Sequence, residues 1–113
     1  MDAQGDVTGE FNGYGVWQFV PSSGWKQLTA SDATLLVAGS GGTVGGEFRG
    51  YGIWLYQPAA GWHQLNTVDA TRLAVDMNGD TLGEFPAYGV WEYDPARGWF
   101  QVSASDALLL AAI

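Results

Sequence analysis

The stretch GEFRGYGIWLYQPAAGWHQL, residues 46–65, occurs three times in this chain with few changes. The other two copies are residues 9–28 and 83–102. Phe48 lies 37 residues from its counterpart on either side, and no insertion breaks this spacing. A fixed period of this length is typical of repeat proteins, in which each repeat is one supersecondary unit. We therefore expect a single repeat domain over residues 1–113, made of the units 5–41, 42–78 and 79–113.

Each unit contains four short apolar segments that are separated by turn residues. In the first unit the segments are Val7–Phe11, Gly15–Val20, Trp25–Thr29 and Thr34–Ala38. Short runs rich in aromatic and aliphatic residues favour strands over helices. A proline followed three residues later by a glycine, as in Pro21–Gly24, predicts a turn, because proline presets φ and glycine tolerates positive φ. The sequence therefore predicts an all-β fold with four strands in each unit.

Two further local patterns indicate how the strands are connected and which way they face. Gly41-Gly42 predicts a hairpin between the last strand of one unit and the first strand of the next. Asp32 is expected to accept backbone N–H groups in a polar turn. Alternation along the second strand places Trp17 on a strongly apolar face and Gln18 on a half-apolar one. We expect Trp17 in the core and Trp25 in a groove.

Composition excludes several classes of protein. The chain has six Trp and 17 Gly, no Cys, and a net charge of −8 with only four Lys and Arg. Disulfides and cysteine metal sites are therefore excluded, and no basic patch is available for nucleic acid or an anionic membrane. No apolar run approaches the roughly 20 residues of a membrane span. Residues 1–4 lack the pattern of a signal peptide, so we expect none in this sequence.

The repeated pattern GEF-x-x-YG-[VI]-W … GW-x-Q resembles a known family. It is similar to the bacterial β-propeller repeats of the DFG-x-x-GLW type, which are related to FG-GAP and VCBS propellers, and less closely to tachylectin-type lectin propellers. The chain departs from the FG-GAP pattern in having Glu before Phe, and in its shorter loops. The resemblance implies one four-stranded blade per unit, a binding or scaffolding role, and a secreted or cell-surface bacterial protein, although the sequence itself leaves the compartment open.

A closed propeller has roughly four to eight blades, and one chain supplies only three units. The last expected strand, Leu108–Ala112, has its hairpin partner in Val7–Phe11 at the other end of the chain. We therefore expect a ring closed by oligomerisation, as a homodimer with six blades or, as the second choice, a nine-bladed trimer. A monomeric β-trefoil is the alternative fold, although its units are usually longer.

The repeated aromatic residues predict equivalent sugar-binding sites between blades. Sugar C–H faces stack on aromatic rings, and carboxylates and amides bind the hydroxyl groups. The candidate ligand-binding residues are Trp25, Trp62, Trp99, Tyr14, Tyr51, Tyr88, Glu10, Glu47, Glu84, Gln27, Gln64 and Gln101. Packing between blades explains the same repetition, because large aromatic side chains are usually buried. Two functions stay open: a lectin-like module, and a structural or engineered symmetric scaffold without a ligand.

One acidic turn resembles the calcium loop of FG-GAP repeats. Its candidate metal ligands are Asp76, Asn78, Asp80 and Glu84, since calcium prefers several oxygen ligands. The middle copy, residues 39–43, keeps the turn but lacks these oxygens, so we favour a polar hairpin turn and expect no cofactor. His63 has no matching catalytic or metal-binding partner, and carboxylates repeated three times suit structure better than one active site. We therefore expect no enzymatic activity.

Overall fold

A computed structural model describes residues 5–75 and 80–105 of the chain. Over these residues strands alternate with tight turns, and one short 3-10 turn, η1 (Ser40–Gly42), joins two of the strands. The strands form three antiparallel sheets. Sheet 1 has the order β1 (Val7–Phe11), β2 (Gly15–Val20), β3 (Gly24–Thr29). The all-β prediction is therefore confirmed, and the strand bounds follow the expected segments closely.

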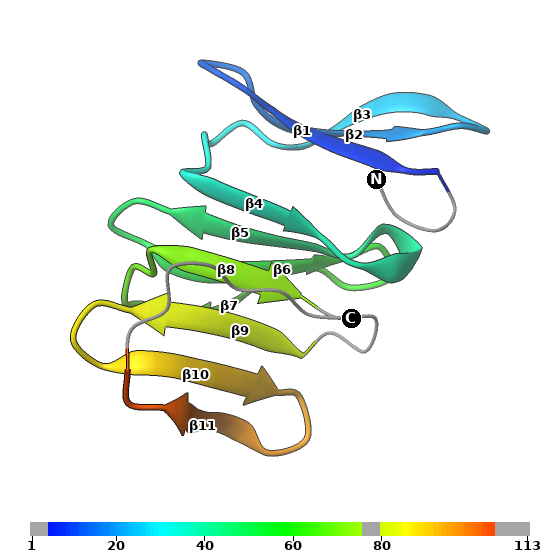
Figure 1. Ribbon diagram of the computed structural model, residues 1–113. Helices are drawn as coiled ribbons and strands as arrows, with labels where there is room; N and C mark the ends of the chain where they lie inside the picture. The colour runs from blue at the N-terminus through cyan, green and yellow to red at the C-terminus, as the bar shows by residue number, and fades with distance from the viewer. Residues whose placement is uncertain (1–4, 76–79, 106–113) are drawn as a thin grey trace.

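Sheets 2 and 3 each contain four strands. Sheet 2 has the order β4 (Leu35–Ala38), β5 (Val44–Phe48), β6 (Gly52–Gln57), β7 (Gly61–Asn66). Sheet 3 has the order β8 (Arg72–Val75), β9 (Thr81–Phe85), β10 (Gly89–Asp94), β11 (Gly98–Ser103), here written in chain order. The three sheets lie one above another, with sheet 1 at one end and sheet 3 at the other (Figure 1). Contacts of β4 with β1 and with β8 join neighbouring sheets.

Sheets 2 and 3 take their first strand from chain that has just left the preceding sheet. In sheet 2, β4 pairs with β5, with Leu35 opposite Glu47 and Ala38 opposite Val44. The hairpin predicted at Gly41-Gly42 is thereby confirmed. Strand β4 belongs to the first sequence unit, but it is hydrogen-bonded into the second sheet. The sheets therefore do not coincide with the 37-residue units of the sequence. In sheet 1, β1 pairs only with β2 among the described residues, and the strand predicted over 108–112 lies outside them.

The turns form where the sequence predicts them. In the first Pro-to-Gly turn, Ser23 N donates to Val20 O at 2.9 Å, and Gly24 has a φ of 87°. Asp32 accepts backbone N–H groups as expected, from Gly13 at 2.8 Å and Gly15 at 2.9 Å. The turn that it caps is the β1–β2 hairpin, which lies far earlier in the sequence. Asp32 therefore ties the end of sheet 1 back to its beginning.

The packing of the sheets reverses one expectation. On β2 the face expected to be half-apolar is the more buried one: Val16 is 0% and Gln18 2% exposed, whereas Trp17 is half-buried. The expectation that Trp17 lies in the core is wrong. The cause is the stacking, because the Val16 face lies against the next sheet, where Gln18 Nε2 donates to Gly42 O at 3.1 Å. A buried polar side chain is tolerated there because it has this acceptor.

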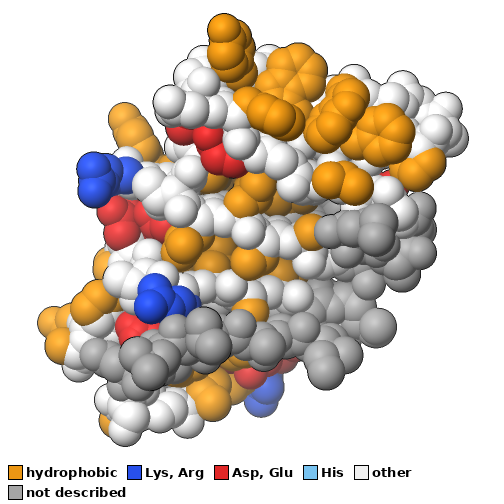
Figure 2. Space-filling view, turned by 45° about the horizontal axis from the view of Figure 1, so that its top comes forward, with side chains coloured by type: hydrophobic (Ala, Val, Ile, Leu, Met, Phe, Trp, Pro, Cys, Tyr) orange, Lys and Arg blue, Asp and Glu red, His pale blue; other side chains and the backbone are white. Residues whose placement is uncertain are grey.

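Each aromatic face therefore lies over the opposite face of the preceding sheet. In the central cluster, Ile53 of sheet 2 packs with Leu73 and Phe85 of sheet 3. Gly83 lies so close to Ile53 that an added Cβ would stand 3.3 Å from the Ile53 side chain. Sheet 1 has no preceding sheet among the described residues. Its aromatic face is consequently the outer surface at one end of the stack, where hydrophobic side chains gather (Figure 2).

Candidate ligand-binding pocket between sheets

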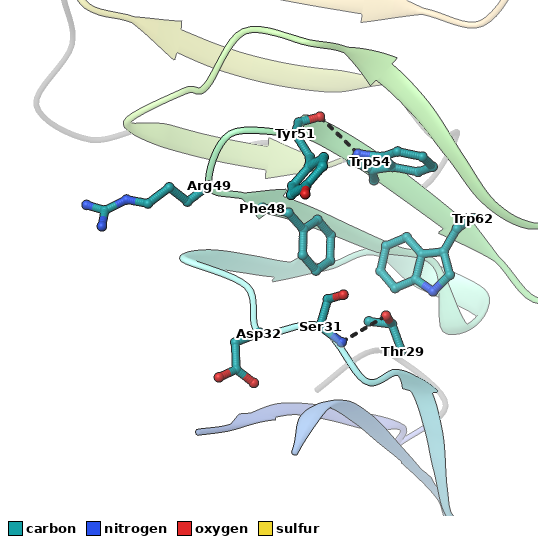
Figure 3. Close-up of a pocket in the computed structure, with 8 residues that line it drawn as sticks. All are labelled: Thr29, Ser31, Asp32, Phe48, Arg49, Tyr51, Trp54 and Trp62. Atoms are coloured by element: carbon teal, nitrogen blue, oxygen red, sulfur yellow. Dashed lines mark hydrogen bonds between the residues drawn. The ribbon is translucent and has the colours of Figure 1, made fainter. Parts of the chain in front are cut away.

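A pocket of about 410 Å³ opens between sheet 1 and sheet 2. It is lined by Thr29, Ser31, Asp32, Phe48, Arg49, Tyr51, Trp54 and Trp62. Tyr51 and Trp54 form one wall, Trp62 stands at the side, and the polar residues at and after the end of β3 lie opposite (Figure 3). The Arg49 side chain extends away from the others. The pocket therefore has an aromatic side from one sheet and a polar side from the preceding sheet.

Tyr51 is held at the end of a tight turn that presents its ring. Its backbone N donates to Phe48 O at 2.8 Å, and its carbonyl accepts both Trp54 Nε1 at 3.0 Å and Gln64 Nε2 at 2.7 Å. The backbone of Tyr51 thus fixes two neighbouring side chains, while its own side chain is 67% exposed. An exposed ring on a rigid turn is suited to stacking against a ligand.

Trp62 serves both packing and the pocket. Its ring lies edge-on to that of Phe48, with 5.6 Å between the ring centroids, and tilted against that of Tyr56, with 5.3 Å between the centroids. Its indole N–H crosses to sheet 1 and donates to Leu28 O at 3.0 Å. The two interpretations that the sequence left open for this tryptophan, a core role and a pocket role, therefore apply to the same side chain.

The polar side of the pocket offers an acceptor and hydroxyl groups. Both Asp32 oxygens accept backbone N–H groups, and a carboxylate oxygen has capacity for a further hydrogen bond. Ser31 N donates to Thr29 Oγ1 at 3.2 Å, which fixes the chain next to the pocket. The Ser31 hydroxyl has no partner within the described part of the chain. These groups face aromatic rings, an arrangement suited to a molecule with an apolar face and polar edges.

The predicted glutamates and glutamines lie outside this pocket. Glu47 is 2% exposed and accepts Ala70 N at 3.0 Å, so it holds the connection between β7 and β8. Burial, together with the neighbouring Asp69 carboxylate, raises the pKa of Glu47 to about 7. The backbone N–H of Gly50 holds the pKa of Asp69 below its ordinary value.

The same backbone contacts recur in the other units. Glu10 accepts Ala33 N at 2.9 Å. Gln27 and Gln101 donate to Tyr14 O and Tyr88 O at 2.9 and 3.0 Å, as Gln64 does to Tyr51. One amide N–H of the glutamine is therefore already engaged by a backbone carbonyl in each unit.

The pocket also contains residues that the sequence reasoning did not propose as ligand contacts, namely Trp54, Asp32, Ser31, Thr29, Phe48 and Arg49. Trp54 and Asp32 repeat in every unit, so their phase was a usable signal. What the sequence could not give is the pairing of Asp32 from one unit with Trp54 from the next, which depends on how the sheets stack.

Equivalent aromatic positions recur on the other two sheets. On sheet 1, Phe11, Tyr14, Trp17 and Trp25 line a hollow of about 370 Å³. On sheet 3, Tyr88 is 70% exposed, Trp91 Nε1 donates to Tyr88 O, and Trp99 Nε1 donates to Leu65 O, each at 3.0 Å. The aromatic half of the site is thus present three times.

Only part of the candidate calcium loop can be placed. Asp76 and Asn78 lie outside the described residues, whereas Glu84 is 2% exposed and accepts the Thr71 hydroxyl at 3.2 Å. Over residues 5–75 and 80–105, no three His, Asp or Glu side chains are grouped so as to hold a metal ion. In the same part of the chain, no helix has the length and apolar character of a membrane span.

No protein-family model matches this chain, and no curated protein matches it.

Proposed function

We propose that this chain is a non-enzymatic, self-assembling β-propeller module that binds carbohydrate in the aromatic pockets between neighbouring sheets. The observation that carries the proposal is the pocket between sheets 1 and 2. It places the exposed ring of Tyr51 and the rings of Trp54 and Trp62 opposite Asp32. Its volume of about 410 Å³ falls within the range of small-ligand sites.

The charge of the site favours a neutral saccharide. Asp32 lines the pocket, the Arg49 side chain extends away, and the chain carries a net charge of −8. An anionic sugar would meet this negative charge at close range, whereas a neutral sugar can donate a hydroxyl to Asp32 and stack its C–H face on Tyr51.

The arrangement of the sheets supports propeller blades over a β-trefoil. The described strands form three separate antiparallel sheets, and the aromatic face of one sheet lies over the opposite face of the preceding sheet. In a trefoil the three units would instead share the strands of one barrel. Three blades per chain reach the usual number in a ring when two chains join, so the proposed assembly is a homodimer with six blades.

The test is titration of the protein with a panel of neutral mono- and disaccharides, followed by tryptophan fluorescence and calorimetry. We expect binding that Tyr51→Ala weakens by about two- to tenfold, since stacking on one ring contributes about 0.5–1.5 kcal/mol. Tyr51→Phe, which keeps the ring, should bind as the wild type does. His63→Gln, an exposed change outside the pocket, is the matched control. Absence of binding across the panel at about millimolar sugar refutes the carbohydrate function.

A scaffold without a ligand is the second candidate. It is favoured by the use of the repeated polar groups, because Gln64, Glu47 and the indole of Trp62 all have protein partners. Packing alone therefore accounts for these repeated residues. It does not account for the exposed ring of Tyr51, whose side chain could be removed without breaking any of these contacts.

A further inference from the structure

The two junctions between neighbouring sheets repeat one hydrogen bond. Trp62 Nε1 of sheet 2 donates to Leu28 O of sheet 1, and Trp99 Nε1 of sheet 3 donates to Leu65 O of sheet 2, both at 3.0 Å. Leu28 and Leu65 are each skipped in the pairing of their strands, so each occupies a β-bulge. A bulge turns a carbonyl out of the ladder, which explains why these two are available to an indole from the next sheet.

The same donor and the same acceptor recur, unused, at the two ends of the stack. Trp25 is the counterpart of Trp62, its side chain is 51% exposed, and its indole N–H has no acceptor among the described residues. Val102 occupies the equivalent bulge on β11, and it is 55% exposed. No indole from the described part of the chain donates to its carbonyl. Strands β3 and β11 lie at opposite ends of the molecule (Figure 1), so one chain cannot join these two groups.

The face around Trp25 is also exposed where its counterparts are buried. Phe11 is 46% exposed, whereas Phe48 and Phe85 are 8% and 6% exposed. Val7 is 38% exposed, and its counterpart Val44 is fully buried. The difference arises because sheets 2 and 3 have a preceding sheet over this face, whereas sheet 1 has none among the described residues. An apolar surface thus lies at the sheet 1 end of the stack (Figure 2). The other two sheets show what covers such a surface, namely the opposite face of a neighbouring sheet.

The hollow on this face is half of a pocket. The four residues that line it occupy the same repeat positions as the four aromatic residues of the larger pocket. What it lacks is the polar side, to which Thr29 and Ser31 contribute in the larger pocket. The counterparts of these two residues are Ser103 and Ser105, which follow the bulge on β11. The two halves of a further pocket thus lie at opposite ends of each chain.

We propose that a second copy of this chain covers the aromatic face of sheet 1 with its β11 end, and that the junction completes a further carbohydrate pocket. In this junction Trp25 donates to the carbonyl of Val102 of the partner subunit. The aromatic side of the new pocket comes from one copy and the serine hydroxyls from the other. The ligand part rests on the proposed function, while the junction itself rests on the repeated hydrogen bond. Because sugar then binds the assembled form at an extra site, sugar must also tighten the assembly.

Sedimentation velocity over a concentration series, together with native mass spectrometry, tests the junction. Trp25→Phe keeps the ring and removes the N–H, so one hydrogen bond of about 1 kcal/mol is lost at each junction. In a dimer closed by two junctions the dissociation constant should rise about 30-fold. Trp99→Phe is the matched control: it removes the same bond within the chain, so it should lower the melting temperature and leave the dissociation constant within about twofold.

Phe11→Lys provides a second variant that does not depend on one hydrogen bond. It places a charge on the face that becomes buried, so the variant should be monomeric with the β-sheet circular dichroism of the wild type. A wild-type monomer at tens of micromolar overturns the inference. Assembly that neither Trp25→Phe nor Phe11→Lys weakens also overturns it, because the copies would then meet at another face.

Sugar binding separates the two proposals. A saccharide that binds should lower the dissociation constant of the assembly, and it should bind the wild type with more equivalents per chain than it binds Phe11→Lys. Tyr51-dependent binding by a strict monomer refutes this inference and the assembly part of the proposed function, and it leaves the carbohydrate function standing. Assembly through Trp25 with no sugar binding supports the junction, and it overturns the composite pocket together with the carbohydrate function.

Discussion

The carboxylate of Glu47 accepts a hydrogen bond from the backbone N–H of Ala70 at 3.0 Å, in a position where Glu47 is only 2% exposed. The contact joins β5 to the chain that has just left β7, and it places an ionisable group between sheets. Desolvation there raises the pKa of Glu47 to about 7. The same group is thus a structural acceptor and a titratable site.

The stability of the protein should fall as the pH rises through this range. The folded-state pKa of Glu47 lies above its ordinary value of 4.5, so the folded state holds the proton more tightly than the unfolded state. Ionisation therefore costs folding free energy from about pH 4.5 upward, and the loss levels off above about pH 7. Between these pH values the free energy of unfolding of the wild type should fall by about 1–3 kcal/mol more than that of Glu47→Gln. The lowered pKa of Asp69 acts in the opposite sense and at lower pH.

Urea unfolding at several pH values between 5 and 8 measures this effect. Glu10→Gln is the matched control, since Glu10 accepts the equivalent bond from Ala33 but is only half-buried. A Glu47→Gln variant with the same slope of stability against pH as the wild type would contradict the assignment.

Ala87→Gly should stabilise the protein. Ala87 has a φ of 69° in the turn between β9 and β10, whereas the first two units have Gly13 and Gly50 at this position. An L-residue in this region costs about 1–2 kcal/mol, partly offset by the greater freedom of glycine in the unfolded chain. We expect a net gain of about 0.5–1 kcal/mol in thermal unfolding. The reverse change, Gly50→Ala, should destabilise, and a loss of stability in Ala87→Gly would contradict the argument.

Gly13→Ala and Gly15→Ala separate backbone strain from steric overlap. Both glycines have a φ of 82°. An added Cβ meets nothing within 4 Å at Gly13, whereas at Gly15 it overlaps the carbonyl oxygen of Thr29. We expect Gly13→Ala to cost about 1–2 kcal/mol and Gly15→Ala to cost more than about 4 kcal/mol, which denaturant unfolding measures. Equal costs for the two variants would show that the overlap is relieved by a shift of β3.

Asp32→Asn should weaken the β1–β2 hairpin. The carboxylate accepts two backbone N–H groups, one on each oxygen, and an amide offers only one oxygen to accept them. The expected loss is about 1–3 kcal/mol in chemical unfolding. Asp69→Asn, which loses one of the two equivalent bonds from Gly50 N and Gly52 N, should cost a similar amount. A variant as stable as the wild type would mean that water replaces the lost acceptor.

Local features of this protein follow from its sequence. The 37-residue period, the strand segments and the Pro21–Gly24 turn were all predictable, because alternation and turn chemistry act over a few residues. The pairing of β4 with β5 was predictable as well, because two strands joined by a short glycine-rich connection usually pair as a hairpin.

Only the tertiary structure decided which face of each strand is buried and which polar groups face a pocket. Gln18 is buried and Trp17 half-buried because the next sheet covers one side of β2, and a hydrophobicity pattern favours the opposite assignment. Asp32 caps a hairpin of its own sheet and also lines the pocket of the next. These relationships join residues about half a unit to a whole unit apart, and they exist only once the sheets have stacked, because the partner of each group lies on a different sheet or hairpin.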